Sequence, residues 1–169
     1  LPISREVLVK LSTILRRLLS QTETFVPLRD ELEFIDNYLD IELVRFGPDK
    51  LRFRKEVDES TLGALVPSML LQPIIENSIR HGLGRRIEGG EIHLRTARHN
   101  GRVIIEIRDT GVGIPADKIP DIFASGIGIS NVHERLKVLY GKDFVFHIDS
   151  KEGQGTFIRI EIPETPGPL

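Results

Sequence analysis

The sequence predicts an α+β fold: a two-layer α/β sandwich in which a mixed, mostly antiparallel sheet carries helices on one face, preceded by an N-terminal helical segment. Apolar residues recur at helical spacing over residues 7–46, and short segments of alternating polarity follow from residue 51. Two further helical patterns interrupt those segments. Because each kind of element has an apolar face to bury, helices and strands are expected to stack as layers.

The composition is that of an ordinary globular domain. The chain has 169 residues, 40% hydrophobic and 28% charged, which suffices for one domain with a helical appendage. A formal net charge of -2 disfavours a nucleic-acid partner, and the lack of cysteine excludes disulfides and thiolate metal sites. No apolar run approaches the roughly 20 residues that span a bilayer. Because the chain opens at Leu1 within a helical pattern, we expect a fragment of a longer protein.

Residues 1–47 are expected to form two helices, because they carry two apolar stripes. The first stripe comprises Val7, Leu8, Leu11, Ile14, Leu15, Leu18 and Leu19. The second comprises Leu28, Leu32, Ile35, Leu39, Leu43 and Phe46. Pro27 suits the first turn of that second helix. We expect a helical hairpin or dimer arm at residues 1–47, a separate domain at residues 48–163 and a disordered tail at residues 164–169.

Beyond residue 48 the sequence alternates as half-buried strands do. The apolar residues that share an inward parity are Leu51, Phe53, Val57, Ile92, Leu94, Val103, Ile105 and Ile107. Asn100-Gly101 predicts a tight hairpin between two of these strands, and residues 144–148 and 156–162 predict another strand pair. The sheet is therefore expected to be largely antiparallel.

Two helical patterns lie between the strands, at residues 68–81 and 129–140. Gly82 follows the first and Gly141 follows the second, and each glycine suits the left-handed position that ends a helix. Helices on one face of the sheet complete the predicted sandwich.

Asp109 is the most informative single residue. It has the strand parity of Ile105 and Ile107, so its carboxylate should face the core, where an ionised group without partners is costly. Gly111 and Gly113 follow it and let the backbone turn sharply and approach a flat ligand. Such a carboxylate can accept hydrogen bonds from an exocyclic amine such as that of adenine. The alternative is a turn aspartate that caps local amides.

The helix at residues 68–81 carries Asn77, Arg80 and His81 on one face. This combination suits a magnesium triphosphate, because an amide oxygen can bind a hard cation while the two basic side chains face phosphate oxygens. The alternative is a solvated Glu76–Arg80 pair, with His81 favoured only by the dipole at a helix C-terminus.

Gly126-Ile127-Gly128 precedes the helix that begins at Ile129, and free amides at a helix start attract an anion such as phosphate. The segment is neither a Walker loop nor a dinucleotide fingerprint. Thr156 shares the parity of Ile158 and places a hydroxyl on the inner face of the last strand. It can equally be a satisfied core threonine.

These four motifs occur in an order that resembles the GHKL superfamily of ATP-binding proteins, which contains the histidine kinases, gyrase and MutL. Pro73 to Gly82 is similar to the N box, and Asp109 to Ile114 to the first glycine box. Gly126 to Gly128 is similar to the second glycine box, and Gly155 to Phe157 to the closing strand.

Within that superfamily the amino-acid sequence most resembles the LytS-type sensor histidine kinases, over nearly the whole chain. Leu71 to Asn77, Gly126 to Leu136 and Leu28 to Phe46 carry this likeness. The resemblance implies the Bergerat sandwich, with ATP held between helices and sheet beneath a flexible lid at residues 115–125.

The resemblance also implies roles for single residues. Asn77 would coordinate Mg²⁺, Arg80 and His81 would approach the phosphates, and Asp109 would bind the adenine amine. The remaining nucleotide-binding residues would be Gly111, Gly113, Ile114, Gly126, Ile127, Gly128, Ile129 and Thr156. Glu76 is a hypothetical catalytic residue, which would orient the nucleophile or accept its proton. The nucleophile would be a histidine imidazole, and phosphoryl transfer needs mostly positioning and charge neutralisation.

Two departures from the family pattern shape the functional expectation. Pro73 stands where many members of the superfamily carry an acidic or amide residue. The family's phosphoacceptor lies in a Pro-His-Phe-Leu-Phe-Asn segment, and none of His81, His93, His99, His133 and His147 has that context. We therefore expect this fragment to bind ATP without phosphorylating itself, and the acceptor histidine to lie outside it.

The implied partners are the phosphoacceptor region of the same or a dimer-partner chain and a response regulator. The full-length protein is expected to be a homodimeric, membrane-anchored sensor of which this is a cytoplasmic domain. Two alternatives stay open: another GHKL ATPase or serine kinase of the anti-sigma type, and a non-enzymatic dimerisation module.

Overall fold

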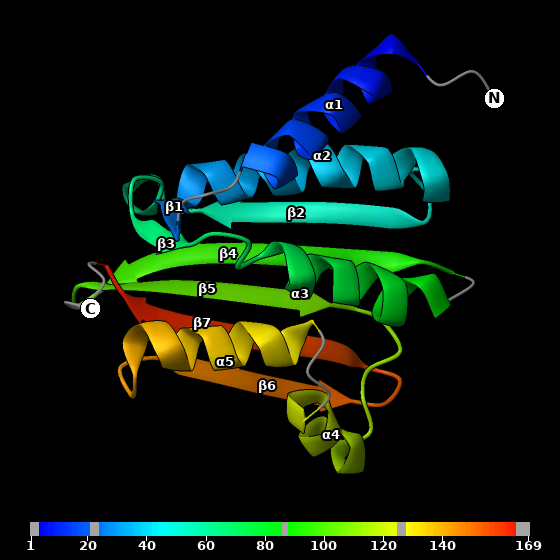
Figure 1. Ribbon diagram of the computed structural model, residues 1–169. Coiled ribbons are helices and arrows are strands. Elements are labelled where there is room, and N and C mark those ends of the chain that lie inside the picture. Colours follow the sequence, from blue (N-terminus) through cyan, green and yellow to red (C-terminus); the bar gives the residue numbers. More distant parts are fainter. Residues whose placement is uncertain (1–3, 21–23, 86–87, 125–127, 165–169) are drawn as a thin grey trace.

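The computed structural model describes residues 4–20, 24–85, 88–124 and 128–164, which form a two-layer α/β sandwich (Figure 1). The strands of its five-stranded sheet are β2 (Leu51–Val57), β4 (Gly90–His99), β5 (Arg102–Asp109), β6 (Val145–Lys151) and β7 (Gly155–Pro163). They lie in the order β2-β4-β5-β7-β6, in which β2 pairs with β4 in parallel and every other pair is antiparallel. The predicted mixed, mostly antiparallel sheet is confirmed.

The helices of the sandwich lie on one face of this sheet, as predicted (Figure 1). They are α2 (Leu28–Phe46), α3 (Gln72–Asn77) and α5 (Ile129–Tyr140). Helix α1 (Arg5–Ser20) packs on the outer side of α2, and α4 (Ile119–Ala124) lies at one end of the sheet. Short strands β1 (Phe25–Pro27) and β3 (Leu65–Pro67) form a separate antiparallel pair.

Alternation along the strands places the core between the layers. Ile105 and Ile160 are almost fully buried where β5 and β7 pair, whereas Glu106 and Arg159 occupy the outer face and form an ion pair. Helix α2 contributes Leu28 and Ile35, both with 0% exposure, to the same apolar cluster. The core is therefore continuous across residue 47, and α2 belongs to the helical layer of the sandwich.

The Asn100-Gly101 hairpin is confirmed, with φ values of 50° and 71° at its two central residues. Both are positive, as a two-residue turn between twisted strands requires. Gly141 ends α5 as predicted: its φ is 64°, and its N–H donates to Lys137 O at 2.8 Å.

The helix predicted over residues 68–81 was wrong at both ends. It begins at Gln72, because residues 68–71 form an irregular segment, and Gly82 does not stop it. The chain continues through a π-helical turn, Ser78–Gly82, and a 3-10 turn, Leu83–Arg85. Gly82 does not have the positive φ of a helix cap. A Cβ at this position would lie 3.2 Å from Asp109 Oδ1, so the reason for glycine is close approach.

The described part of the chain ends just beyond β7. Glu164 donates its N–H to Gly101 O at 3.1 Å, and residues 165–169 of the expected tail lie outside the described residues. In the described part of the chain, no helix is both long enough and apolar enough to cross a membrane.

Candidate functional site

A cavity of about 450 Å³ opens at the end of the sheet where α3, α5 and the segment after β5 converge. Its walls come from the end of α3 and the following turn, the loop after β5, residues 115–122 and the start of α5. A cavity of this size with a few polar groups is the usual form of a small-molecule site. Most of the residues singled out from the sequence line it.

Asp109 forms the floor of the cavity, with 4% of its surface exposed. Its Oδ1 accepts a hydrogen bond from Gly111 N at 2.8 Å, and the Ser78 hydroxyl and the Thr156 backbone also donate to the carboxyl. Burial is the largest influence and raises the pKa of this carboxyl, although the three donors oppose the rise. A carboxylate offers about four acceptor positions, so these donors leave room for one from the cavity.

Glycines surround Asp109 because the backbone passes too close for side chains. A Cβ at Gly111 would lie 2.4 Å from Gly82 Cα and 2.8 Å from Asp109 Oδ1. Gly113 has a φ of 69°, and a Cβ there would collide with Lys151 O. Gly111 therefore brings bare backbone to the carboxylate, whereas Gly113 brings it to Lys151.

A serine that the sequence analysis missed organises the far wall. Ser150 Oγ accepts from Ile114 N at 2.8 Å, donates to Gly155 O at 2.9 Å and lies 2.8 Å from Thr156 Oγ1. Thr156 is buried and lines the cavity. The hydrogen bond with Ser150 fixes the position of its hydroxyl. Only the register of β6 against β7, which pairs Ser150 with Thr156, identifies this residue.

The three polar residues predicted on the helix at residues 68–81 do not all reach the cavity. Asn77 and His81 line it, whereas Arg80 is exposed and lies outside its walls. Glu76 also lies outside them and accepts a hydrogen bond from Gln72 Nε2 at 2.9 Å. The charges of Glu76 and Arg80 act instead on Tyr38 of α2, whose pKa is raised chiefly by burial.

The segment predicted as a lid contains a 3-10 turn, Ala116–Lys118, and helix α4. Lys118 and Asp121 line the cavity, and neither was predicted as a site residue. Their side chains lie 4.0 Å apart. The Phe123 ring contacts the His133 ring of α5 edge to face, with centroids 5.1 Å apart. This contact joins α4 to the rest of the domain.

The second glycine motif is described only in part. Gly126 and Ile127 lie outside the described residues. Gly128 has a φ of 61° and lines the cavity together with Ile129, the first residue of α5. The start of α5 therefore faces the same space as Asp109 and Asn77.

The model of the family described as histidine kinase-, DNA gyrase B-, and HSP90-like ATPase matches residues 66–166. The chain belongs to this ATPase family. A second family model, described as histidine kinase, matches residues 3–51 of the same chain. The match to the ATPase family thus follows a histidine kinase segment that includes α1 and α2.

The resemblance of this ATPase domain to LytS-type sensor kinases is confirmed by its relatives. The sensor protein LytS of Bacillus anthracis is 30% identical over 97% of this chain and 29% of its own length. The sensor protein kinase HptS of Staphylococcus aureus is 31% identical over 98% of this chain and 33% of its own length. The chain therefore spans about a third of the length of these relatives.

Solved structures confirm the fold of the ATPase domain. The histidine kinase domain of a blue-light activated kinase from Erythrobacter litoralis covers 94% of this chain with a TM-score of 0.62 and 19% identity. That domain is covered over 73% of its length. The nucleotide-free catalytic domain of the histidine kinase ThkA gives a TM-score of 0.65 at 18% identity. It covers 85% of this chain and is itself covered over 98% of its length.

Proposed function

We propose that this chain is the ATP-binding catalytic domain of a two-component sensor histidine kinase. It would bind magnesium ATP in the cavity above Asp109 and transfer the γ-phosphoryl group to a histidine outside this fragment. The observation that carries the proposal is the buried Asp109 carboxylate, which lies against the bare backbone of Gly82 and Gly111 at the floor of a cavity.

The adenine ring fits the floor of the cavity. Asp109 has an acceptor position left for an exocyclic amine after its three protein donors are counted. Gly82 lines the cavity without a side chain and would let a flat ring approach, and Ile114 and Ile129 supply apolar surface in the same cavity. Fixed by Ser150, the Thr156 hydroxyl would support the ring directly or through water.

The phosphates would lie between α3 and the start of α5. Asn77 can offer its amide oxygen to Mg²⁺, which completes its shell with water and phosphate oxygens. The ion, when bound, neutralises charge on the transferring group. His81 and the amides and dipole at the start of α5 act on the same oxygens. We assign Lys118 as a further phosphate-facing cation, because it lines the cavity whereas Arg80 does not.

Catalysis by this domain would then consist of orientation and charge stabilisation rather than covalent chemistry. ATP supplies the phosphoryl group, and Asn77, His81 and Lys118 fix the direction in which that group is presented. Glu76 remains a hypothetical base. Because it lies outside the cavity and is held by Gln72, it could act only on an acceptor histidine that approaches from the α2 side.

The wider role concerns the whole protein, of which this chain is about a third. We propose that its acceptor histidine lies in the same or a dimer-partner chain and that the phosphoryl group passes to a response regulator. One solved neighbour is ThkA in complex with the response regulator TrrA. Exposed apolar residues of α1, such as Val9 at 57% and Leu15 at 50%, support a homodimer contact. We further propose that this domain is the cytoplasmic part of a membrane-anchored sensor.

Calorimetric titration of magnesium ATP and of a non-hydrolysable analogue tests the proposal. Wild type is expected to bind both, and Asp109→Asn, checked for folding, is expected to bind neither. Asp149→Asn is the matched control, because it makes the same substitution at an exposed carboxylate on β6. A wild-type chain that does not bind would refute the nucleotide role.

Labelled γ-phosphate separates kinase from hydrolase. The isolated chain is expected to bind the label without stable incorporation, because its five histidines lack the acceptor context. Stable incorporation into this chain would contradict that expectation. Steady release of inorganic phosphate would favour a gyrase-type ATPase instead.

A further inference from the structure

Residues 68–71, here called the clamped segment, join β3 to α3 and are held by Glu31 from α2. The Glu31 carboxylate accepts from Met69 N at 2.8 Å, from Leu70 N at 3.1 Å and from Leu71 N at 3.3 Å. Only 2% of Glu31 is exposed. A buried carboxylate that accepts three backbone amides determines the path of that backbone closely.

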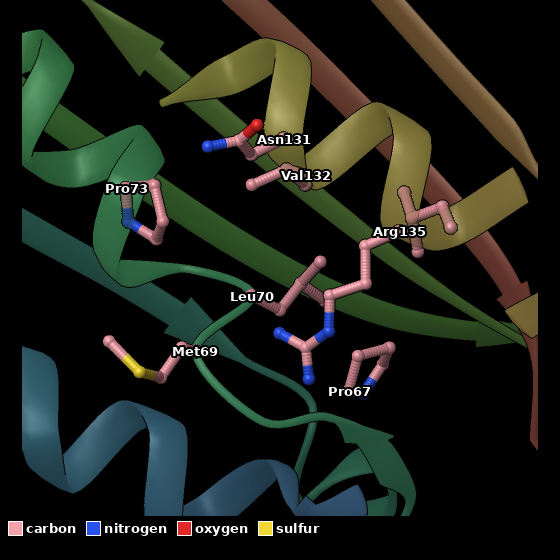
Figure 2. Close-up of a pocket in the computed structure, with 8 residues that line it drawn as sticks. Pro67, Met69, Leu70, Pro73, Asn131, Val132 and Arg135 are labelled. Atoms are coloured by element: carbon pink, nitrogen blue, oxygen red, sulfur yellow. The ribbon is translucent and has the colours of Figure 1, made fainter. Parts of the chain in front are cut away.

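The same segment is held from the opposite side by Arg135 of α5. Its guanidinium donates to Ser68 O, to Ser68 Oγ at 3.0 Å and to Thr24 O at 3.4 Å. Figure 2 shows the Arg135 side chain reaching from α5 toward the chain near Leu70 and Pro67. The negative charge of Glu31 also acts on this guanidinium, although the two side chains bind different atoms of the segment.

The polar contacts act together with apolar packing, because Leu70 and Leu71 of the segment are buried in the core. Met69 has a φ of 57°, in a left-handed region that a residue with a Cβ adopts only when its surroundings dictate it. Between the segment and α5 lies a cavity of about 160 Å³, lined mainly by apolar residues such as Pro73 and Val132 (Figure 2). This space leaves α3 and α5 room to shift relative to each other.

The contacts of Glu31 and Arg135 connect to the two helices, α3 and α5, that wall the nucleotide cavity. The clamped segment runs directly into α3, which carries Asn77 toward the cavity, and His81 follows one turn later. Arg135 lies on α5, whose first residue Ile129 lines the opposite wall. Helix α2, which holds Glu31, is the last helix of the histidine kinase segment.

We propose that Glu31 and Arg135 are positioning residues that couple α2 to the nucleotide cavity through the clamped segment. A movement of α2 would shift the segment by way of Glu31, and Arg135 would carry that shift to α5. Both walls of the cavity would then respond together. The inference rests on the proposed function for its nucleotide readout, although the coupling itself is a property of the protein alone.

The test compares five variants of the 169-residue chain with wild type by calorimetric titration of a non-hydrolysable ATP analogue. Glu31→Gln and Arg135→Gln are each expected to weaken binding by about fivefold or more. The double variant is expected to be no weaker than the worse single variant, because both act through one segment. Asp36→Asn, which pairs with Lys55 at 2.7 Å on the same helix as Glu31, and Lys137→Gln on α5 are controls expected to stay within about twofold.

A second measurement does not depend on nucleotide. Amide hydrogen exchange reports on the first turn of α5, where Val132 N donates to Gly128 O at 3.2 Å. Glu31→Gln is expected to accelerate exchange at Val132, and Asp36→Asn is not. The three printed hydrogen bonds of Glu31 go to residues 69–71, so an effect confined to those residues would leave the Val132 amide unchanged.

The outcomes are distinguishable. If wild type binds the analogue and both folded single variants bind it equally well, the coupling is refuted while the proposed function stands. If the two single effects multiply in the double variant, the shared route is refuted. If wild type does not bind, the proposed function fails, and exchange at Val132 alone decides the coupling. Should Arg135→Gln not fold, Ser68→Ala removes only the hydroxyl contact and takes its place.

Discussion

Gly111 and Gly82 touch backbone to backbone beside the buried carboxylate: a Cβ at Gly111 would lie 2.4 Å from Gly82 Cα. The loop after β5 and the turn after α3 are therefore joined where the candidate adenine position lies. Val112 N also donates to Gly82 O at 3.2 Å across this junction. This close approach joins the motif at residues 73–82 to the glycine motif at residues 109–114.

Gly111→Ala is expected to force these two segments apart. We expect it to lower the free energy of unfolding by about 1–3 kcal/mol, the usual cost of overpacking, and to abolish nucleotide binding. Chemical denaturation and calorimetric titration measure the two effects. Gly63→Ala is the matched control, since its Cβ would meet only Arg29 Nη2 at 3.4 Å. Equal stability of the two variants would contradict the role of close approach.

The nucleotide-free fold should become more stable when Asp109 loses its charge. Burial raises the pKa of Asp109 above its value in the unfolded chain. A carboxyl shifted in this direction stabilises the fold fully below its unfolded-state pKa, and this stability is lost as the pH rises through the folded-state pKa. Above the folded-state pKa the ionised Asp109 therefore destabilises the fold, and there Asp109→Asn is expected to raise the Tm while removing nucleotide binding.

Thermal unfolding from acidic to neutral pH measures this prediction. The difference in Tm between Asp109→Asn and wild type should close below a pH of roughly 4, where both states of the carboxyl are largely protonated. An asparagine variant that is less stable than wild type at every pH would show that the hydrogen bonds of the carboxylate outweigh its burial.

Ser150 is expected to matter for both stability and binding. Ser150→Ala removes a hydroxyl that joins Ile114 N, Gly155 O and Thr156 Oγ1, and leaves part-buried polar atoms without this partner. We expect a loss of about 1–3 kcal/mol in stability and a weaker affinity for the ATP analogue. Ser60→Ala, at an exposed turn far from the cavity, should change neither by a comparable amount. An unchanged affinity in the Ser150 variant would remove Thr156 from the adenine contact.

The position of helix α4 should depend on the aromatic side chain of Phe123. Phe123 lies edge to face against His133 of α5 and against Phe146 of β6, with centroid separations of 5.1 and 6.0 Å. Such pairs contribute about 0.5–1.5 kcal/mol each beyond the area they bury. Phe123→Ala is expected to accelerate amide exchange over residues 119–124 and to weaken nucleotide binding. Val138→Ala, on an 81% exposed position of α5, is the control and should do neither.

Local sequence patterns were sufficient to predict the elements that are specified by a few neighbouring residues. The apolar period and the flanking glycine predicted α5 over residues 129–140, and Asn100-Gly101 predicted the hairpin between β4 and β5. Strand parity alone placed Asp109 on the inner face, where it is buried. These predictions held because each depends on the backbone geometry of a contiguous stretch.

Other features depend on residues that are distant in the sequence. Glu31 and Met69 are 38 positions apart, and Arg135 and Ser68 are 67 apart, so no local pattern links either pair. The parallel pairing of β2 with β4 was likewise absent from the prediction, because alternation shows which face a strand buries and not which neighbour it takes. The helix expected at residues 68–81 began late, since Met69 has a φ of 57°, which lies outside the right-handed helical region.

The sequence by itself determined the fold class, the inward direction of Asp109 and the glycines beside it, because period and parity are properties of the chain. Only the tertiary structure decided which polar groups meet. It placed Asn77 and His81 in the cavity and Arg80 and Glu76 outside it. It also brought Glu31 and Arg135 to opposite sides of one segment. Burial makes such contacts energetically decisive, and burial is a property of the folded whole.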